Sequence, residues 1–170
     1  METLWSPWRS KYIQGFKDED CKNQECFLCK AADFVEMDKE LLVVARMPHS
    51  LVIMNRYPYN SGHILVAPNR HVGGMEDISS DEMIEIMTTV QQSVVILKTI
   101  YKPQGFNIGV NIGRVAGAGV PGHVHFHVVP RWSGDTNFMS VLGEINVVSE
   151  EISEARNALA HEFSKVKLHK

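Results

Sequence analysis

Cysteine is scarce in this sequence. The chain of 170 residues contains three cysteines, Cys21, Cys26 and Cys29, all within nine consecutive positions. An odd number of clustered cysteines does not form the paired framework of a small secreted domain, and it indicates a reducing compartment instead. We therefore expect a cytoplasmic protein without structural disulfides, in which some of these thiols are available to a metal ion.

Long apolar runs and an excess of basic residues are also missing. No apolar segment approaches the roughly 20 residues that a membrane-spanning helix needs, and the first residues carry neither the basic start nor the apolar core of a secretory signal. Lysine and arginine number 17 against 20 aspartates and glutamates, so the formal net charge is −3. We therefore expect no membrane and no nucleic acid as partners. A few well-placed groups can still bind an anionic substrate.

Internal repeats and low-complexity segments are absent from the sequence. A chain of this length and composition is typical of one soluble domain with a single core. We expect one domain over residues 1–170, with an aromatic N-terminal extension over residues 1–20 and a C-terminal helical segment over residues 141–170. The aromatic side chains of the extension need a cover, which is either the domain itself or a second subunit.

The main positive feature is a histidine-rich stretch. Three histidines alternate with apolar residues in the order His123, Val124, His125, Phe126, His127, Val128. This alternation predicts a β-strand, because successive side chains leave opposite faces. One face can enter a core, while the other carries three imidazoles spaced roughly 6–7 Å apart. We interpret three histidines in register as a chemical site; the alternative is a histidine-rich strand that binds metal incidentally.

Four further segments predict strands. Apolar runs bounded by turn residues cover residues 41–46, 50–55, 63–68 and 106–111. Most of these runs follow one another through short connections, which favours antiparallel pairing. The sequence therefore predicts an α+β fold with an antiparallel sheet of about five strands.

Two segments predict helices. Ser79 and Glu82 have the spacing of a capping box, and apolar residues at intervals of three and four follow them. Pro103 and Gly105 end this long helix. A shorter C-terminal helix is expected from near Ser149 to about residue 163.

A glycine-rich connection over residues 113–122 leads directly into the histidines. Its glycines permit positive φ angles and a close approach of backbone N–H groups to an anion. It matches neither the Walker nor the dinucleotide fingerprint, and it leads into no helix. Its pattern alone favours a flexible loop. Its position before three histidines favours a phosphate cradle with Gly117, Gly119 and Val120 as candidate substrate-binding residues.

Cys26 and Cys29 form a C-x-x-C motif. Such a pair can be half of a zinc site, a redox pair, or a motif without function. No thioredoxin-like βαβ pattern follows it, which disfavours the redox alternative. Two cysteines cannot complete a tetrahedral site, so a metal would need two further ligands from elsewhere in the chain.

Residues 123–129 match every position of the pattern His-φ-His-φ-His-φ-φ, where φ is apolar, and so resemble the signature of the histidine triad (HIT) superfamily. The resemblance extends to residues 55–58, residues 62–68 and Asn111. Trp5-Ser6-Pro7-Trp8-Arg9 and residues 130–138 resemble the bacterial HIT branch of diadenosine tetraphosphate phosphorylases and hydrolases. The resemblance implies a HIT-like fold and a homodimer.

The resemblance also implies a reaction. HIT proteins cleave nucleotide phosphoanhydrides or phosphoramidates at the α-phosphorus through a nucleotidyl-histidine intermediate. By position, His125 is the nucleophile, and a neutral imidazole suits that role. Its far nitrogen must donate to a backbone carbonyl so that the attacking nitrogen is unprotonated. His127 and His63 are expected to contact the phosphate or leaving group, with a protonated imidazole stabilising charge there.

Substrate and metal ligands follow from the same resemblance. Asn55 is expected at a ribose hydroxyl, and Asn111 at a phosphate oxygen or the pocket wall. Part of the family carries a structural zinc, whose ligands here would be Cys26, Cys29, His71 and His123; no organic cofactor is expected. The implied substrate is a dinucleoside polyphosphate such as diadenosine tetraphosphate. A phosphoramidate hydrolase and a zinc-stabilised nucleotide-binding protein with little turnover remain as alternatives, and the sequence leaves phosphorolysis and hydrolysis both open.

Overall fold

The computed structural model of the chain describes residues 26–135 and 150–166. The N-terminal extension, Cys21 and residues 141–149 of the expected C-terminal segment lie outside these ranges. The helices and strands are α2 (Phe27–Asp33), β1 (Val43–Arg46), β2 (Ser50–Met54), β3 (Ile64–Pro68), α3 (Ser80–Tyr101), β4 (Gly105–Val110), β5 (Phe126–Arg131) and α5 (Ile152–Lys165).

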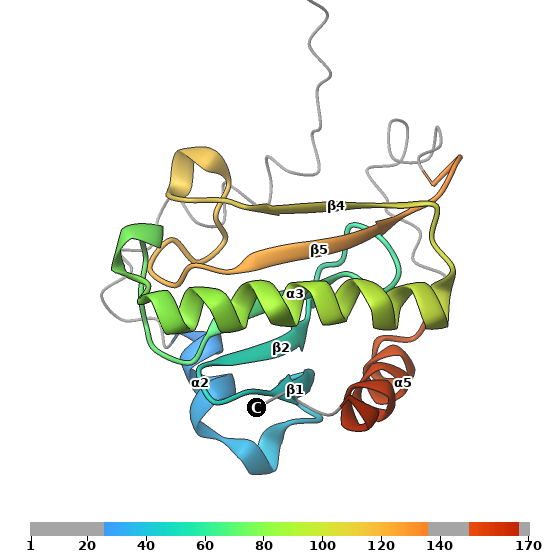
Figure 1. Ribbon diagram of the computed structural model, residues 1–170, viewed down its shortest axis with the longest axis horizontal. Helices are drawn as coiled ribbons and strands as arrows, with labels where there is room; N and C mark the ends of the chain where they lie inside the picture. The colour runs from blue at the N-terminus through green and yellow to red at the C-terminus, as the bar shows by residue number, and fades with distance from the viewer. Residues whose placement is uncertain (1–25, 136–149, 167–170) are drawn as a thin grey trace, which may run out of the picture.

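The five strands form one antiparallel sheet with the order β1-β2-β3-β5-β4. The predicted α+β fold is therefore confirmed. In Figure 1, β4 forms the upper edge of the sheet, and α3 crosses in front of the strands. The helix α5 contacts both β1 and α3, and α2 lies near the opposite end of β1 from α5 (Figure 1).

The core lies between the sheet and the helices. Phe126 and Val128 of β5 belong to the same buried cluster as Ile86 of α3 and Leu159 of α5. Since side chains alternate along a strand, His127 points to the opposite face of the sheet from this cluster. The capping box predicted for α3 is present: the Ser79 side chain accepts from the Glu82 N–H, and the Glu82 carboxylate accepts from the Ser79 N–H. Across residues 26–135 and 150–166, no helix has both the length and the apolar character needed to cross a bilayer.

The histidine stretch is only partly a strand. β5 begins at Phe126, so His123 and His125 precede it, and the expectation of three histidines on one regular strand is wrong. The reason is a different backbone partner: the Val124 N–H donates to the Val72 carbonyl at 2.7 Å. The segment before β5 therefore pairs with the connection that follows β3. Similarly, His63 lies one residue before β3.

One helix was not expected, and another begins later than expected. The seven-residue helix α2 contains Cys29 and was not predicted, because it is short and its N-cap Cys26 makes no side-chain capping bond. Its C-terminal end is held from β1, where the Arg46 guanidinium donates to the carbonyls of Ala31 and Ala32. The helix α5 begins at Ile152 rather than near residue 149, because Glu151 accepts from the Glu154 N–H as its N-cap.

Candidate active site and metal centre

The four expected metal ligands lie together. Their ligand atoms are all within 4.8 Å of one another. Cys26 Sγ lies 3.3 Å from His123 Nδ1, and Cys29 Sγ lies 3.1 Å from His71 Nδ1 and 3.5 Å from His123 Nδ1. The fold therefore brings Cys26 and Cys29, which precede the sheet, against residues from two later segments of the chain.

These four residues fit a tetrahedral metal ion. Zn–S and Zn–N bonds of about 2.3 and 2.0 Å place neighbouring sulfur and nitrogen ligands roughly 3.5 Å apart, which agrees with the observed separations. The His123 Nε2 lies 2.9 Å from the Pro68 carbonyl oxygen. This hydrogen bond leaves Nδ1 as the coordinating nitrogen. Burial and the adjacent Cys26 raise the pKa of the Cys29 thiol to about 11, so a nearby cation is needed to favour the Cys29 thiolate.

Two contacts place His71 in this cluster. The neighbouring Arg70 donates to both carboxylate oxygens of Glu82, at 3.1 and 3.0 Å, and so ties the loop to the first turn of α3. A Cβ on Gly122 would lie 3.2 Å from His71 Nε2. The absence of a side chain at Gly122 therefore gives room to a metal ligand, which is a different use of glycine from the anion cradle expected for this segment.

His125 is oriented by a backbone carbonyl. Its Nδ1–H donates to the His123 carbonyl oxygen at 2.8 Å, and the side chain is 5% exposed. Burial lowers the pKa of His125 below its ordinary value, so the imidazole is neutral and its Nε2 carries a lone pair. The hydrogen bond that a nucleophile at this position requires is therefore present.

His63 and His127 form a second hydrogen-bonded pair. The Tyr59 N–H donates to His63 Nδ1 at 3.0 Å, so the proton of neutral His63 is on Nε2. This Nε2–H donates to His127 Nδ1 at 3.0 Å. The proton of neutral His127 is then on its Nε2, and the ring centroids of His125 and His127 are 5.1 Å apart. A backbone amide thus determines the tautomers of two side chains.

The electrostatics of this pair differ from expectation at His63. Burial, followed by the nearby His127 and His125, lowers the pKa of His63 to about 3. The fully buried His63 is therefore neutral at physiological pH, so the protonated imidazole expected at the phosphate is not His63. His63 supplies an oriented N–H donor to His127 rather than a positive charge.

The two asparagines expected to bind substrate lie on either side of the histidines in the fold. Asn55 Nδ2 is 3.3 Å from His63 Nδ1, and Asn55 Oδ1 accepts from the Tyr57 N–H. Asn111 follows the end of β4, and its Nδ2 is 3.5 Å from the Gly117 carbonyl oxygen. Asn111 is thus placed beside the glycine-rich loop.

The glycine-rich loop is more ordered than its composition suggests. Gly113 and Gly117 both have positive φ angles, of 79° and 89°. The Gly117 N–H donates to the Arg114 carbonyl at 2.9 Å, so this amide is used inside the loop. Gly119 and Val120 lie nearer the histidines in sequence, and the Val120 carbonyl accepts from the His123 N–H.

Comparison with known proteins identifies the family. The sequence profile of the HIT domain matches residues 36–134. The chain belongs to the HIT family. An AP-4-A phosphorylase from Mycobacterium tuberculosis is 36% identical over 169 residues, covering 97% of this chain and 86% of that protein. An adenosine 5'-monophosphoramidase from Schizosaccharomyces pombe is 30% identical, covering 75% of this chain and 96% of that protein.

Solved HIT structures share the fold. A zinc-bound histidine triad family protein from Mycobacterium smegmatis superposes with a TM-score of 0.65 at 22% identity, covering 83% of this chain and 94% of that one. The HIT domain match begins at residue 36, so Cys26 and Cys29 lie before it, whereas His71 and His123 lie within it. The cluster of these four residues therefore joins the HIT domain to the segment that precedes it.

One feature of the site was not expected from the sequence. The Tyr59 ring lies 4.8 Å from the His63 ring and 6.0 Å from the His127 ring, measured between centroids. Its backbone N–H is the group that orients His63. The side chain of Tyr59 is 44% exposed, so the aromatic ring forms one wall of the site toward solvent. A backbone donor has no residue-type signature, although the turn-rich sequence before His63 marks the loop.

Proposed function

We propose that the protein transfers a nucleotidyl group from a dinucleoside polyphosphate, of the diadenosine tetraphosphate type, to His125 and then to phosphate or water. The observation that carries this proposal is the hydrogen bond from His125 Nδ1–H to the His123 carbonyl oxygen. It leaves Nε2 of a neutral imidazole as the free nucleophilic atom, which is the requirement for attack on phosphorus near pH 7.

The reaction has two displacements. The Nε2 lone pair of His125 attacks the α-phosphorus, a P–N bond forms, and the P–O bond to the departing nucleoside polyphosphate breaks. An oxygen of phosphate or water then attacks the same phosphorus, and the P–N bond breaks. The acceptor loses a proton, and the histidine is regenerated. With diadenosine tetraphosphate, the first leaving group is ATP, and the final product is ADP with phosphate or AMP with water.

The neighbouring groups have roles that follow from their hydrogen bonds. His127 presents an Nε2–H to a non-bridging or leaving oxygen, and His63 holds His127 in that tautomer. Asn55 contacts a ribose hydroxyl, and Asn111 contacts a phosphate oxygen or lines the pocket. Gly119 and Val120 supply backbone N–H groups to the phosphate. Gly117, with its positive φ angle, allows the loop to turn so that these two residues reach the substrate.

The metal in this proposal is a structural zinc ion held by Cys26, Cys29, His71 and His123. A four-ligand site is closed to substrate, so the ion contributes stability and fixes the segment before β5. The ligand separations and the His123–Pro68 hydrogen bond support this assignment. No reaction step depends on the metal, and the thiolate ligands suit the reducing conditions of the cytoplasm.

A homodimer is part of the same proposal. β4 is an edge strand of the sheet, and its Ile108 is 47% exposed. An edge strand with exposed backbone and apolar side chains is a template for pairing with another strand. Two copies joined through β4 would form one continuous sheet. Sedimentation or light scattering of the full chain tests this, and an Ile108→Lys variant is expected to be monomeric.

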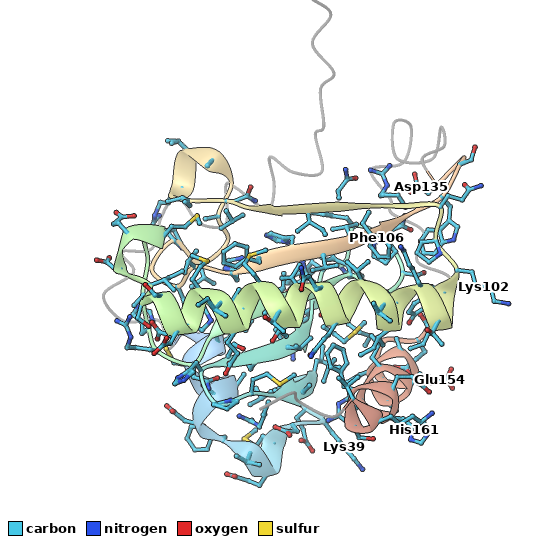
Figure 2. The ribbon with its side chains drawn as sticks, viewed as in Figure 1. Lys39, Lys102, Phe106, Asp135, Glu154 and His161 are labelled. Atoms are coloured by element: carbon cyan, nitrogen blue, oxygen red, sulfur yellow. The ribbon has the colours of Figure 1, made fainter. Side chains whose placement is uncertain are left out.

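The function is tested by trapping the intermediate. The protein is incubated with diadenosine tetraphosphate, quenched in base, and weighed intact by mass spectrometry. A nucleotidyl adduct is expected on the parent protein and on a His161→Ala control, whose histidine lies on α5 (Figure 2). No adduct is expected on His125→Ala. An unmodified parent protein, with turnover intact in His125→Ala, would refute the proposal.

Two further measurements separate the alternatives. Product analysis with and without inorganic phosphate distinguishes phosphorolysis, which releases ADP, from hydrolysis, which releases AMP. Competition between diadenosine tetraphosphate and adenosine 5'-phosphoramidate separates the polyphosphate reaction from the phosphoramidate reaction, which the similarity to the fission-yeast monophosphoramidase makes the second candidate. Binding of AMP without cleavage of either substrate would favour a nucleotide-binding protein with little turnover.

A further inference from the structure

A hydrogen-bonded cluster lies just beyond β5, around the carboxylate of Asp135. Asp135 Oδ2 accepts from Arg131 Nε at 2.6 Å and from the Trp132 N–H at 3.1 Å, while Oδ1 accepts from Arg131 NH2 at 2.8 Å. The Asp135 side chain is 7% exposed. The Arg131 guanidinium also donates to Asn107 Oδ1 at 2.6 Å. Arg131 is the last residue of β5, and it links the Asp135 carboxylate to Asn107 of β4.

One further donor links this cluster to a distant loop. Asn60 Nδ2 donates to Asp135 Oδ2 at 2.8 Å and lies 3.3 Å from the Pro130 carbonyl oxygen. Figure 2 shows Asp135 past the end of β5, at the same end of the molecule as the C-terminal end of α3. Asn60 and Asp135 are 75 positions apart in the sequence, so this hydrogen bond joins the loop before β3 to the segment after β5.

Asn60 is adjacent in sequence to the backbone amide that orients the His63 ring, and it also contacts the His63 backbone. It follows Tyr59, whose N–H donates to His63 Nδ1, and its own carbonyl accepts from the His63 N–H at 3.2 Å. A shift of Asn60 therefore moves the Tyr59 amide relative to the His63 ring. Without that donor, only the Asn55 NH₂, 3.3 Å from His63 Nδ1, still favours an unprotonated Nδ1. The tautomer with the proton on Nδ1 then becomes populated, and Nε2 donates to His127 for less of the time.

We propose that Asp135 is a positioning residue which, through Asn60 and the Tyr59 amide, fixes the tautomers of His63 and His127. Asp135 lies outside the histidine cluster and acts on it through the backbone of residues 59–60. The consequence for catalysis, the delivery of the His127 Nε2–H to the transferring phosphate, rests on the proposed function. The tautomers themselves do not rest on it, and they can be measured without substrate.

The first test is spectroscopic. Nitrogen-15 NMR of the zinc-loaded full chain, labelled at histidine, distinguishes protonated from unprotonated ring nitrogens. The parent protein is expected to show His63 and His127 each protonated at Nε2, with His125 protonated at Nδ1. In Asp135→Ala, the acceptor of the Asn60 NH₂ is gone, so the link is broken and His63 is expected to show shifts averaged between its two tautomers.

Two other variants sharpen this test. Asn60→Ala removes the link and leaves the Arg131–Asp135 ion pair in place, so it is expected to reproduce the change at His63 even if Asp135→Ala fails to fold. Asp38→Asn is the matched control. It breaks another Arg–Asp pair, Arg46 Nε to Asp38 Oδ1 at 3.1 Å, and is expected to leave the His63 and His127 signals unchanged. Parent-like His63 shifts in folded Asn60→Ala would overturn the proposal, as would the same change in Asp38→Asn.

Kinetics give the second readout. A misoriented donor near the reacting phosphorus lowers the rate of the chemical step by roughly tenfold to a hundredfold. Asn60→Ala is expected to lower kcat by that factor with little change in KM. A change in KM alone would contradict the positioning role. If the parent protein forms no nucleotidyl adduct, the proposed function fails while the NMR result still decides the tautomers.

Discussion

Gly62 provides the most direct test of how the His63 loop is packed. Its φ angle is +72°, and a Cβ built on it would lie 2.9 Å from Tyr101 Cε2 and 3.1 Å from Leu97 Cδ2. The Tyr101 ring cannot move away without loss, because its hydroxyl donates to Glu150 Oε2 at 2.7 Å. Gly62→Ala therefore combines an unfavourable backbone conformation with a steric overlap.

The two contributions can be separated by a matched variant. A left-handed conformation costs a non-glycine residue roughly 1–2 kcal/mol, and overpacking costs roughly 1–3 kcal/mol, so Gly62→Ala is expected to lower the free energy of unfolding by about 2–5 kcal/mol. Gly134 has a φ of +79°, and a Cβ there would meet nothing within 4 Å. Gly134→Ala is therefore expected to lose only the backbone contribution.

Urea unfolding of both variants with zinc in excess measures this difference. Adding Tyr101→Phe to Gly62→Ala frees the ring from Glu150 and is expected to recover part of the loss, as a non-additive double-mutant cycle. Equal losses for Gly62→Ala and Gly134→Ala, within about 0.5 kcal/mol, would refute the packing argument. A loss that is equal with and without the Tyr101→Phe change would refute the role of the Tyr101–Glu150 hydrogen bond.

Three further outcomes are expected. Cys29→Ser loses most of its bound zinc by elemental analysis, whereas Cys21→Ser keeps about one ion per chain; equal contents would refute the site. Arg46→Met removes donors from the end of α2, so zinc affinity falls in a chelator competition, and an unchanged affinity would show that α2 needs no anchor. In the folded protein the pKa of His63 is lowered to about 3, whereas the ordinary value for histidine is about 6.5. Neutral His63 therefore contributes fully to the free energy of unfolding above about pH 6.5, and this contribution is lost as the pH falls toward 3. His127, His125 and Tyr59 face this ring, and chemical unfolding from pH 7 to 4.5 is expected to show a shallower decline for His63→Gln than for the parent; equal slopes would contradict this.

The elements that depend on local patterns were predictable. The Ser79–Glu82 capping box fixes the start of α3, and the apolar runs fix β1, β2, β3 and β4 within two residues. The helix α2 was not predictable, because seven residues carry little periodicity and its last carbonyls are satisfied by Arg46 from β1. The helix α2 is stabilised by a contact with a residue outside it, and the local sequence of α2 gives no sign of that contact.

The site was predictable in its side chains and much less so in its backbone. The three alternating histidines and the C-x-x-C cysteines could be identified from their spacing, whereas the roles of His63 and His71 came only from the resemblance to the HIT family. The start of β5 at Phe126 depends on the pairing of Val124 with Val72, which is a non-local contact. The neutral state of His63 depends on complete burial. The Asp135–Asn60 contact links two polar residues of ordinary type, and neither has a distinguishing pattern.

His123 takes part in both halves of the site through different atoms. The His123 imidazole faces the cysteines, while the His123 carbonyl oxygen accepts a hydrogen bond from the His125 Nδ1–H. Every amino acid has such a carbonyl, so the orientation of His125 does not require histidine at this position. The metal site and the tautomer of His125 can therefore change independently during evolution. A lineage can replace Cys26, Cys29, His71 and His123 with well-packed apolar residues and keep the same unprotonated nitrogen on His125, provided that the backbone before β5 stays in place.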